Sequence, residues 1–313
     1  MTMPSSIVVR VPATSANLGP GFDCLGLALD LYNTFRLVLG QPFSMEVTGE
    51  SAERLPRGEN NVVVKAMRRV FLEADVDDAR LPTFSLHLEN QVPVSSGLGS
   101  SASAIVGGLV LGNAVVELVA PDRMLSRDDI LKIATEIEGH PDNVAPALFG
   151  GGILAYHTNA GLRTTSFPVP NGLRFVAATP DFALSTEAAR KVLPSTYDRS
   201  LVIENVAQSA RLMLALATND LNLLRGGLID NLHEPYRMPL VPSAEEVALA
   251  ATAAGALTVT LSGAGPTMLA WCKPEQAVTV ADEMTLAWRN AGTPCRALVL
   301  QPCLCPTQAL YIS

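Results

Sequence analysis

Residues 93–103 read Pro93-Val94-Ser95-Ser96-Gly97-Leu98-Gly99-Ser100-Ser101-Ala102-Ser103 and run without a break into the apolar segment 104–114. A Gly- and Ser-rich loop that opens directly onto an apolar helix leaves backbone N–H groups unpaired at the helix start. The helix dipole adds roughly half a positive charge there. Serine hydroxyls can bind phosphate oxygens or a magnesium ion. The stretch therefore predicts an anion site, and the ligand that we expect there is the phosphate chain of a nucleotide.

Two better-known phosphate loops fit this stretch less well. A P-loop requires a lysine after its second glycine, and the sequence has no lysine between Lys65 and Lys132. The spacing Gly97-x-Gly99-x-x-Ala102 matches a dinucleotide fingerprint, with Glu117 as the candidate ribose-binding acid. In a dinucleotide fold that acid ends a second strand, whereas residues 101–118 read as one helix. A turn that only caps a buried helix stays open as an alternative for this stretch alone.

Length and composition limit the class of protein. The chain has 313 residues, 48% of them hydrophobic, and a formal net charge of −8. Its length predicts two domains, and a Pro- and Gly-containing turn cluster at residues 168–172 places their boundary between 1–168 and 169–313. An acidic chain does not offer the basic stripe that nucleic acid requires, so we expect no nucleic-acid partner.

The chain is expected to be soluble and cytoplasmic. No apolar run reads as a membrane span, and the N-terminal residues 1–6 lack the basic segment of an export signal. The five cysteines are an odd number at low density, which is typical of free thiols in a reducing cytosol. We therefore expect no membrane partner and no structural metal.

Polar residues in other loops are candidates for ligand contacts. A loop expected at residues 12–23, after a strand at 7–11, contains Asn17 and Asp23. Asp23 can neutralise an ammonium group, although both residues could serve only the backbone as Asx turns. Asn61 fits the N-cap of a helix. Arg190 and Arg237 are candidate anion partners, because a guanidinium binds carboxylate in two-pronged fashion, although either could be a surface residue.

Two glutamates stand at the end of a helix predicted from a capping box at Ser126–Asp129. Glu136 and Glu138 are poorly placed there, because the C-terminal end of a helix dipole is negative. Magnesium prefers one or two carboxylates together with phosphate oxygens. One of these glutamates beside the Ser100 and Ser101 hydroxyls would complete a magnesium-nucleotide site, and solvated helix-end charges are the alternative.

Taken together, the loops resemble the motifs of a known family. Residues 93–103 resemble the phosphate loop of the GHMP small-molecule kinases, residues 12–23 their first motif, and residues 262–267, Ser-Gly-Ala-Gly-Pro-Thr, their third. The three motifs follow the family order over nearly the whole chain. Residues 139–146 and 21–26 look most like the branch that phosphorylates L-homoserine.

The resemblance implies an α+β fold of two halves, the first like domain 2 of ribosomal protein S5 and the second a ferredoxin-like α/β half. It implies transfer of the γ-phosphoryl group of ATP to the side-chain hydroxyl of L-homoserine, with Mg²⁺, in threonine biosynthesis. It also implies a homodimer.

Matched by position, the resemblance assigns site residues. ATP would lie on residues 93–103, with Asn61 near the adenine. Magnesium would lie on Ser100 and on Glu136 or Glu138, and the catalytic residues would be Ser100, Asp142 and Thr186. The amino acid would be surrounded by Asn17, Asp23, His140, Asn143, Arg190, Arg237 and Gly263. In this assignment Asp23 meets the ammonium and the two arginines meet the carboxylate.

The mechanism has one open question. In other branches an aspartate at the Asp142 place is credited with taking the hydroxyl proton, whereas the homoserine branch resembles enzymes that act without a base. Phosphoryl transfer asks mainly for positioning and charge neutralisation. Two alternatives to the homoserine reading remain: another acceptor, such as mevalonate or a sugar, and a relative that binds ligands without turnover.

Overall fold

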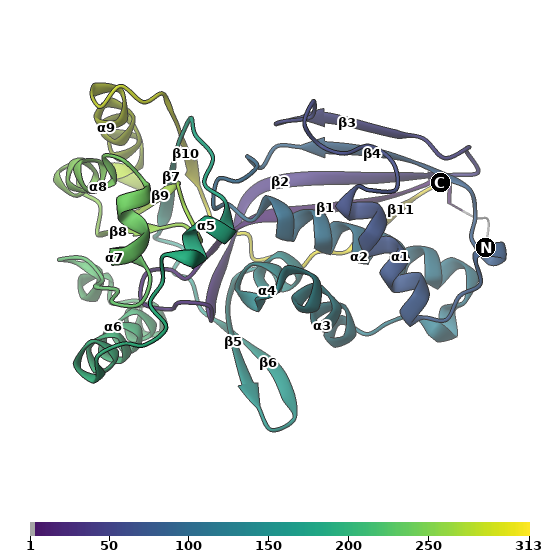
Figure 1. Cartoon of the computed structure of the whole chain (residues 1–313), viewed down its shortest axis with the longest axis horizontal. Coiled ribbons are helices and arrows are strands. Elements are labelled where there is room, and N and C mark those ends of the chain that lie inside the picture. Colours follow the sequence, from purple (N-terminus) through teal and green to yellow (C-terminus); the bar gives the residue numbers. More distant parts are fainter. Residues whose placement is uncertain (1–3) are drawn as a thin grey trace.

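Two β-sheets organise the chain in the computed structural model, which describes residues 4–313 (Figure 1). Residues 1–3 belong to the predicted first domain and to the segment in which we expect no export signal, and they lie outside the described residues. The sheets lie at opposite ends of an elongated molecule, and the loops that we singled out meet between them.

The first sheet has seven strands in the described chain, in the order β11-β1-β2-β4-β3, with β5 paired to β2 and β6. Residues Ile7, Val9 and Val11 alternate into the core, as expected for a strand covered on one face. The strands are β1 (Ser6–Ala16), β2 (Leu25–Leu39), β3 (Met45–Gly49), β4 (Phe84–Asn90), β5 (Gly152–Thr158), β6 (Gly161–Phe167) and β11 (Ala309–Ile312). Helices pack on one face: α1 (Val62–Glu73), α2 (Ser100–Val119), α3 (Arg127–Glu138) and α4 (Pro141–Phe149).

The expected loop at residues 12–23 is wrong at its start. Strand β1 continues through Pro12 to Ala16, and its register with β2 shifts between Pro12 and Ala13. Proline cannot donate to the ladder, and the bulge absorbs the break instead of ending the strand. The loop therefore begins at Asn17, so the paired strands deliver this side chain to the end of the sheet.

Helix α2 is the centre of the first half. It is long and apolar enough to cross a membrane by length and composition, but 78% of its most apolar window is buried inside the protein. Gly108 lets α1 approach closely, since a Cβ there would collide with the Val63 carbonyl oxygen. The predicted helix at 101–118 is confirmed, and this contact packs the start of α1 against the middle of α2.

The second sheet has the order β10-β7-β9-β8 and follows a strand-helix-strand-strand-helix-strand succession through α6 and α9, which is ferredoxin-like. Val176 faces the core under α8 and α9, whereas its neighbour Phe175 faces the core with α6, so both faces of the sheet are covered. Its strands are β7 (Arg174–Pro180), β8 (Thr258–Leu261), β9 (Met268–Cys272) and β10 (Cys295–Leu300). Its helices are α5 (Thr186–Lys191), α6 (Arg199–Thr218), α7 (Glu234–Arg237), α8 (Ala244–Ala253) and α9 (Ala277–Asn290).

The predicted α+β fold class is confirmed. The chain crosses from the first sheet to the second between β6 and β7, and it returns between β10 and β11. We did not foresee β11, because we expected the last strand at 295–300. The division into 1–168 and 169–313 stays a prediction. Leu18 and Leu98 share a core cluster with Phe175 and Trp271, so a continuous core joins the two halves.

Candidate active site

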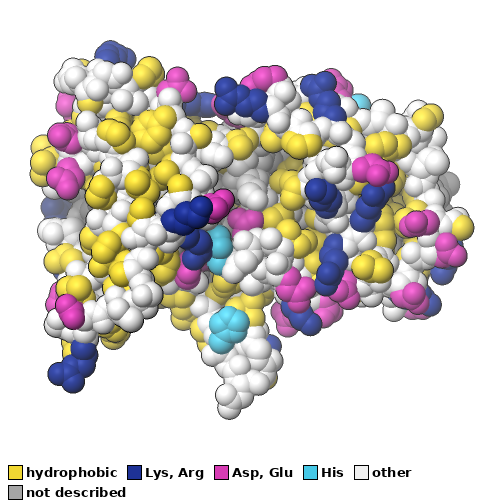
Figure 2. Space-filling view, viewed as in Figure 1, with side chains coloured by type: hydrophobic (Ala, Val, Ile, Leu, Met, Phe, Trp, Pro, Cys, Tyr) yellow, Lys and Arg dark blue, Asp and Glu magenta, His cyan; other side chains and the backbone are white. Residues whose placement is uncertain are grey.

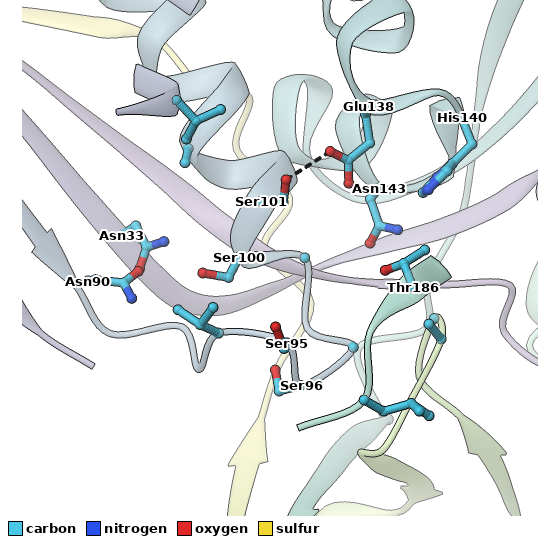
Figure 3. A pocket seen from close by; sticks show the side chains of 18 of the residues that line it. Asn33, Asn90, Ser95, Ser96, Ser100, Ser101, Glu138, His140, Asn143 and Thr186 are labelled. Atoms are coloured by element: carbon cyan, nitrogen blue, oxygen red, sulfur yellow. Dashed lines mark hydrogen bonds between the residues drawn. The ribbon is translucent and has the colours of Figure 1, made fainter. Parts of the chain in front are cut away.

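A pocket with a volume of about 320 Å³ lies where the two halves meet. Most of the predicted site residues line it: Asn17, Asp23, Asn61, Val94, Ser95, Ser96, Gly97, Gly99, Ser100, Ser101, Glu138, His140, Asp142, Asn143, Thr186, Arg190, Arg237 and Gly263. The pocket lining does not include Pro93, Leu98, Ala102, Ser103 or Glu136. In Figure 3 the hydroxyls of Ser95 and Ser100 lie between Asn33 and Asn90 at one end and His140, Asn143 and Thr186 at the other.

The Gly- and Ser-rich loop is held by its carbonyl groups. The Ser262 hydroxyl donates to the Gly97 carbonyl at 2.8 Å, and the Thr14 N–H donates to the Leu98 carbonyl at 3.0 Å. Gly97 has φ +87°, and a Cβ there would collide with the Ser262 carbonyl oxygen. Within the described chain, the N–H groups of Gly97 and Gly99 have no hydrogen-bond acceptor. With the free N–H groups of the first turn of α2, they are the donors that the predicted anion site requires, and the site itself stays a prediction.

Asn33 holds both ends of this loop, and sequence reasoning missed it. Its carbonyl oxygen accepts from the N–H groups of Gln91 and Val92, each at 2.9 Å, and its amide donates to the Ser103 hydroxyl at 2.7 Å. The side chain is buried, with 1% of it exposed. The signal that could have found it is its place in the strand: Asn33 alternates with the inward-facing Phe35 and Leu37, and a buried amide requires partners.

One end of the pocket is apolar. Phe35, Val47 and Leu88 come from three neighbouring strands and line it with Leu55 and Val62. The sequence did not indicate this wall, because its members are distant in the chain.

Asn61 stands at this apolar end as the N-cap of α1, as predicted. Its carbonyl oxygen accepts from the Val63 N–H at 2.9 Å, and its amide donates to the Pro56 carbonyl at 2.7 Å. Its place near the adenine stays a prediction.

The opposite end of the pocket carries paired charges. Arg190 on α5 donates two hydrogen bonds to the Asp23 carboxylate, of 2.7 and 3.1 Å. The hydrogen bond to Asp23 raises the pKa of Arg190 above its ordinary value. Asn17 accepts from the Asp23 N–H at 3.0 Å and donates to the Gly263 carbonyl at 2.9 Å. The first and third motifs are thus joined directly beside the pocket.

Arg237 is almost fully buried behind this pair, with 1% of it exposed. Its Nε donates to the Ala189 carbonyl and its Nη1 to the Gly263 carbonyl, both at 3.1 Å. Burial and the charge of Arg190 lower its pKa below the ordinary arginine value. Among the described residues Nη2 has no hydrogen-bond acceptor, so this N–H pair can serve a ligand.

The start of α4 contributes three neighbouring polar residues. His140 Nδ1 lies 2.5 Å from an oxygen of Asp142, which is 2% exposed, and Asn143 accepts from the Thr14 hydroxyl at 2.8 Å. Burial works against the charged form of His140, but the hydrogen bond and the charge of Asp142 outweigh it, so its pKa lies above 6.5. The buried carboxylate of Asp142 therefore stabilises the charged form of the imidazole beside it.

The structure separates the two candidate metal-binding glutamates. Glu138 faces the pocket and accepts from the Ser101 hydroxyl at 3.0 Å, as Figure 3 shows. Burial raises the pKa of Glu138, against the opposing effects of His140 and Ser101. Glu136 pairs instead with Arg69 at 3.1 Å, outside the pocket.

The donor set near α2 suits a hard cation that brings other ligands. Residues 4–313 contain no cluster of three His, Cys, Asp or Glu side chains that could hold a metal. Glu138 and the hydroxyls of Ser100 and Ser101 provide oxygens only, and a partly buried carboxylate with a raised pKa gains from a nearby cation. Magnesium fits such a site when phosphate oxygens and water complete its shell.

On the face of Figure 2, basic and acidic side chains are mixed, and both signs and a histidine gather where the two halves meet. This face therefore offers a phosphate chain no broad basic surface.

Two family models match the chain, and they define its class. The N-terminal domain of GHMP kinases matches residues 61–151, and the C-terminal domain of GHMP kinases matches residues 205–290. A solved L. major mevalonate kinase in complex with R-mevalonate is 18% identical, covers 96% of this chain and 99% of that one, and has a TM-score of 0.68. At this identity the likeness shows the shared fold alone.

Closer relatives narrow the class. A homoserine kinase of Moorella thermoacetica is 43% identical over 296 residues, which are 95% of this chain and 97% of the relative. A homoserine kinase of Trichormus variabilis is 43% identical, over 93% of this chain and 95% of the relative. The solved homoserine kinase of Cytophaga hutchinsonii is 28% identical, covers 99% of both chains and has a TM-score of 0.85. The chain belongs to the homoserine kinase family of the GHMP kinases.

Proposed function

We propose that the pocket binds ATP and L-homoserine end to end and transfers the γ-phosphoryl group of ATP to the side-chain hydroxyl of L-homoserine. The products are O-phospho-L-homoserine and ADP. The observation that carries this proposal is the pairing of opposite charges, Asp23 with Arg190, in the same pocket as the free N–H groups of the phosphate loop. The end of the pocket with Asp23 and Arg190 suits a zwitterion, and the part beside the phosphate loop suits a polyphosphate.

ATP lies along the loop 93–103 in this proposal. The N–H groups of Gly97 and Gly99 and the start of α2 bind its phosphates, because they are free donors at the positive end of a helix dipole. The base occupies the apolar end near Phe35, Leu88 and Asn61. The absence of a Walker lysine is compensated by backbone donors.

L-Homoserine lies at the charged end. Its ammonium pairs with Asp23, and its carboxylate takes Arg190 and the free Nη2 of Arg237. The ion pair of Asp23 and Arg190 is about a third exposed, so exchanging partners costs little. Asn17, His140, Asn143 and Gly263 line the remaining wall.

Catalysis rests on positioning and charge neutralisation. The transferred group passes between the N-terminus of α2 and α5, within reach of the Ser100 and Thr186 hydroxyls. Asp142 orients the acceptor hydroxyl rather than acting as a strong base, because His140 already occupies one of its oxygens. Ser100 and Glu138 would hold Mg²⁺, which would supply charge neutralisation at the phosphates.

The compartment, the pathway and the oligomeric state that we propose follow from the family resemblance. The chain acts in the cytoplasm, in threonine biosynthesis, as a homodimer of two-domain subunits divided at 1–168 and 169–313. Light scattering on the purified protein tests the dimer, and a monomer mass under assay conditions contradicts it.

A coupled ADP-release assay over L-homoserine, mevalonate and a panel of sugars and amino acids tests the reaction. We expect Mg²⁺-dependent turnover with L-homoserine and little with the other acceptors. Turnover of mevalonate or a sugar instead would assign another acceptor. ATP binding without turnover of any compound would indicate a catalytically silent relative.

A further inference from the structure

A histidine that does not line the pocket contacts a residue that does. His233 precedes α7 and is fully buried. Its Nδ1 lies 3.3 Å from Arg237 Nη1, and its Nε2 lies 3.0 Å from the Gly19 carbonyl oxygen. His233 thus links Arg237 to the loop that carries Asn17 and Asp23.

The partners decide where the His233 proton lies. Arginine can only donate, so Nδ1 of His233 must accept from Arg237. A carbonyl can only accept, so Nε2 carries the proton and donates it to Gly19. Asp230, 3.7 Å from Nε2, favours a charged ring, but burial and the charge of Arg237 oppose it, and the pKa of His233 lies below its ordinary value. The neutral imidazole satisfies both partners.

Stacking and capping hold this ring in place. Phe22 stacks on His233 with 5.2 Å between ring centroids, and the Arg237 guanidinium lies 5.1 Å from the Phe22 centroid. Asp230 accepts from the His233 N–H at 2.8 Å. Arg237 is therefore fixed by Ala189, Gly263 and His233, with Nη2 left for a ligand.

We infer that His233 is a positioning residue that aims Arg237 at the carboxylate of the acceptor and so makes the site select amino acids over simple amino alcohols. The inference rests on the proposed function, in which Arg237 meets that carboxylate. His233 does not touch the substrate, and it acts by occupying the Nη1 side of the guanidinium so that Nη2 faces the pocket. Without the His233 ring, the Arg237 guanidinium is free to turn toward the Ala189 and Gly263 carbonyls, and Nη2 no longer faces the pocket.

Two substitutions separate the two hydrogen bonds of the ring. In His233→Gln the amide nitrogen can replace Nε2 as donor to Gly19, and no acceptor remains at the Nδ1 place. In His233→Asn the side-chain oxygen can replace Nδ1 as acceptor from Arg237. We expect His233→Gln to lower kcat/KM for L-homoserine about 10- to 100-fold with an unchanged KM for ATP. We expect His233→Asn to retain most of the activity.

An acceptor without the carboxylate provides the decisive comparison. 3-Amino-1-propanol keeps the hydroxyl, the chain and the ammonium of homoserine. We expect His233→Gln to change its kcat/KM by less than about threefold, because the lost alignment concerns a group that this acceptor lacks. The inhibition constant of L-2-aminobutyrate, which keeps both charges and lacks the hydroxyl, should rise in His233→Gln and not in His233→Asn.

Three results would overturn the inference: equal losses for the two acceptors, an equal rise in the KM for ATP, or an unchanged inhibition constant for L-2-aminobutyrate in His233→Gln. Each would make His233 a part of the scaffold only. Failure of the wild-type protein to phosphorylate L-homoserine would refute the proposed function instead, so the two failures are distinguishable.

Discussion

Asp23 and Arg190 meet in a two-pronged ion pair, with 2.7 Å between Arg190 Nη2 and Asp23 Oδ1 and 3.1 Å between Nη1 and Oδ2. Asp23 belongs to the loop between β1 and β2, and Arg190 belongs to α5, so the pair joins the two halves of the molecule across the pocket. A zwitterion can insert by offering each partner a replacement charge. In the proposed acceptor site, the pair therefore keeps both charges satisfied in the absence of substrate.

Asp23→Ala should raise the KM for L-homoserine about 10- to 100-fold, because the ammonium loses its charged partner. The KM for ATP should stay constant, since the phosphate loop is untouched. Steady-state kinetics with each substrate varied in turn measures both values. Asp122→Ala, a change at an exposed residue outside the pocket, is the control. An unchanged KM for the acceptor in Asp23→Ala would indicate an acceptor without an ammonium group.

Asp142→Asn should lower kcat less than about 10³-fold, a cost of about 4 kcal/mol. The amide can still hold the acceptor hydroxyl, and a residue that only orients the nucleophile is worth less than a required base. Rapid-quench experiments measure the rate constant of phosphoryl transfer in Asp142→Asn and in the wild type. The binding of ATP and of homoserine is measured separately. A larger loss with intact binding of both substrates would restore Asp142 as the catalytic base.

Glu138→Gln should raise the Mg²⁺ concentration for half-maximal activity about tenfold, because the one carboxylate that accepts from Ser101 beside the phosphate loop loses its charge. Glu136→Gln is a matched control two residues away. Glu136 pairs with Arg69 outside the pocket, so its replacement should leave the Mg²⁺ dependence unchanged. Equal effects of the two substitutions, or no effect of either, would contradict the assignment of Glu138.

His140 should make stability depend on pH. Its pKa is raised in the folded protein, so the stabilisation is fully present below its ordinary value of 6.5 and is lost as the pH rises through the folded value. His140→Asn should therefore lower the Tm more at about pH 5.5 than at about pH 8.5. We expect an extra loss of about 2–4 °C at the lower pH.

The matched control for this pH effect is His157→Asn, on the exposed end of β5. It should change the Tm little at either pH. Thermal unfolding followed by circular dichroism measures the Tm of the wild type and of both variants in both buffers, six values in all. A larger loss for His140→Asn at the higher pH would show that the imidazole is neutral beside Asp142.

Local patterns predicted the elements that depend on short-range physics. The capping box at Ser126 and Asp129 is present, Asn61 caps its helix, and the apolar stretch after Gly99 is the buried helix α2. Each of these follows from neighbours within about one turn, so a single sequence contains the necessary information.

Features that depend on distant segments could not be predicted in this way. Strand β11 forms because β1 offers a free edge some 300 residues earlier in the chain. The apolar wall near Phe35 exists only after β2, β3 and β4 have paired. The hydrogen bonds of Asn33 to both ends of the phosphate loop likewise depend on that pairing. The separation of Glu136 from Glu138 depends on which side of α3 faces α2, and the spacing alone left that open.

Asn33→Ala should raise the KM for ATP about 10- to 100-fold and leave the KM for L-homoserine unchanged, because the phosphate loop loses the contacts that fix its two ends. The variant should also unfold at a lower temperature, since the buried Val92 N–H and Ser103 hydroxyl and the Gln91 N–H lose their partner. Asn113→Ala separates these effects. Asn113 is also buried, 7% exposed, and bonds the N–H and the carbonyl of Leu125 away from the pocket. Both variants should be destabilised, and only Asn33→Ala should change the KM for ATP. If the two variants lose stability equally and both keep their affinity for ATP, the loop does not need the hydrogen bonds of Asn33 to bind phosphate.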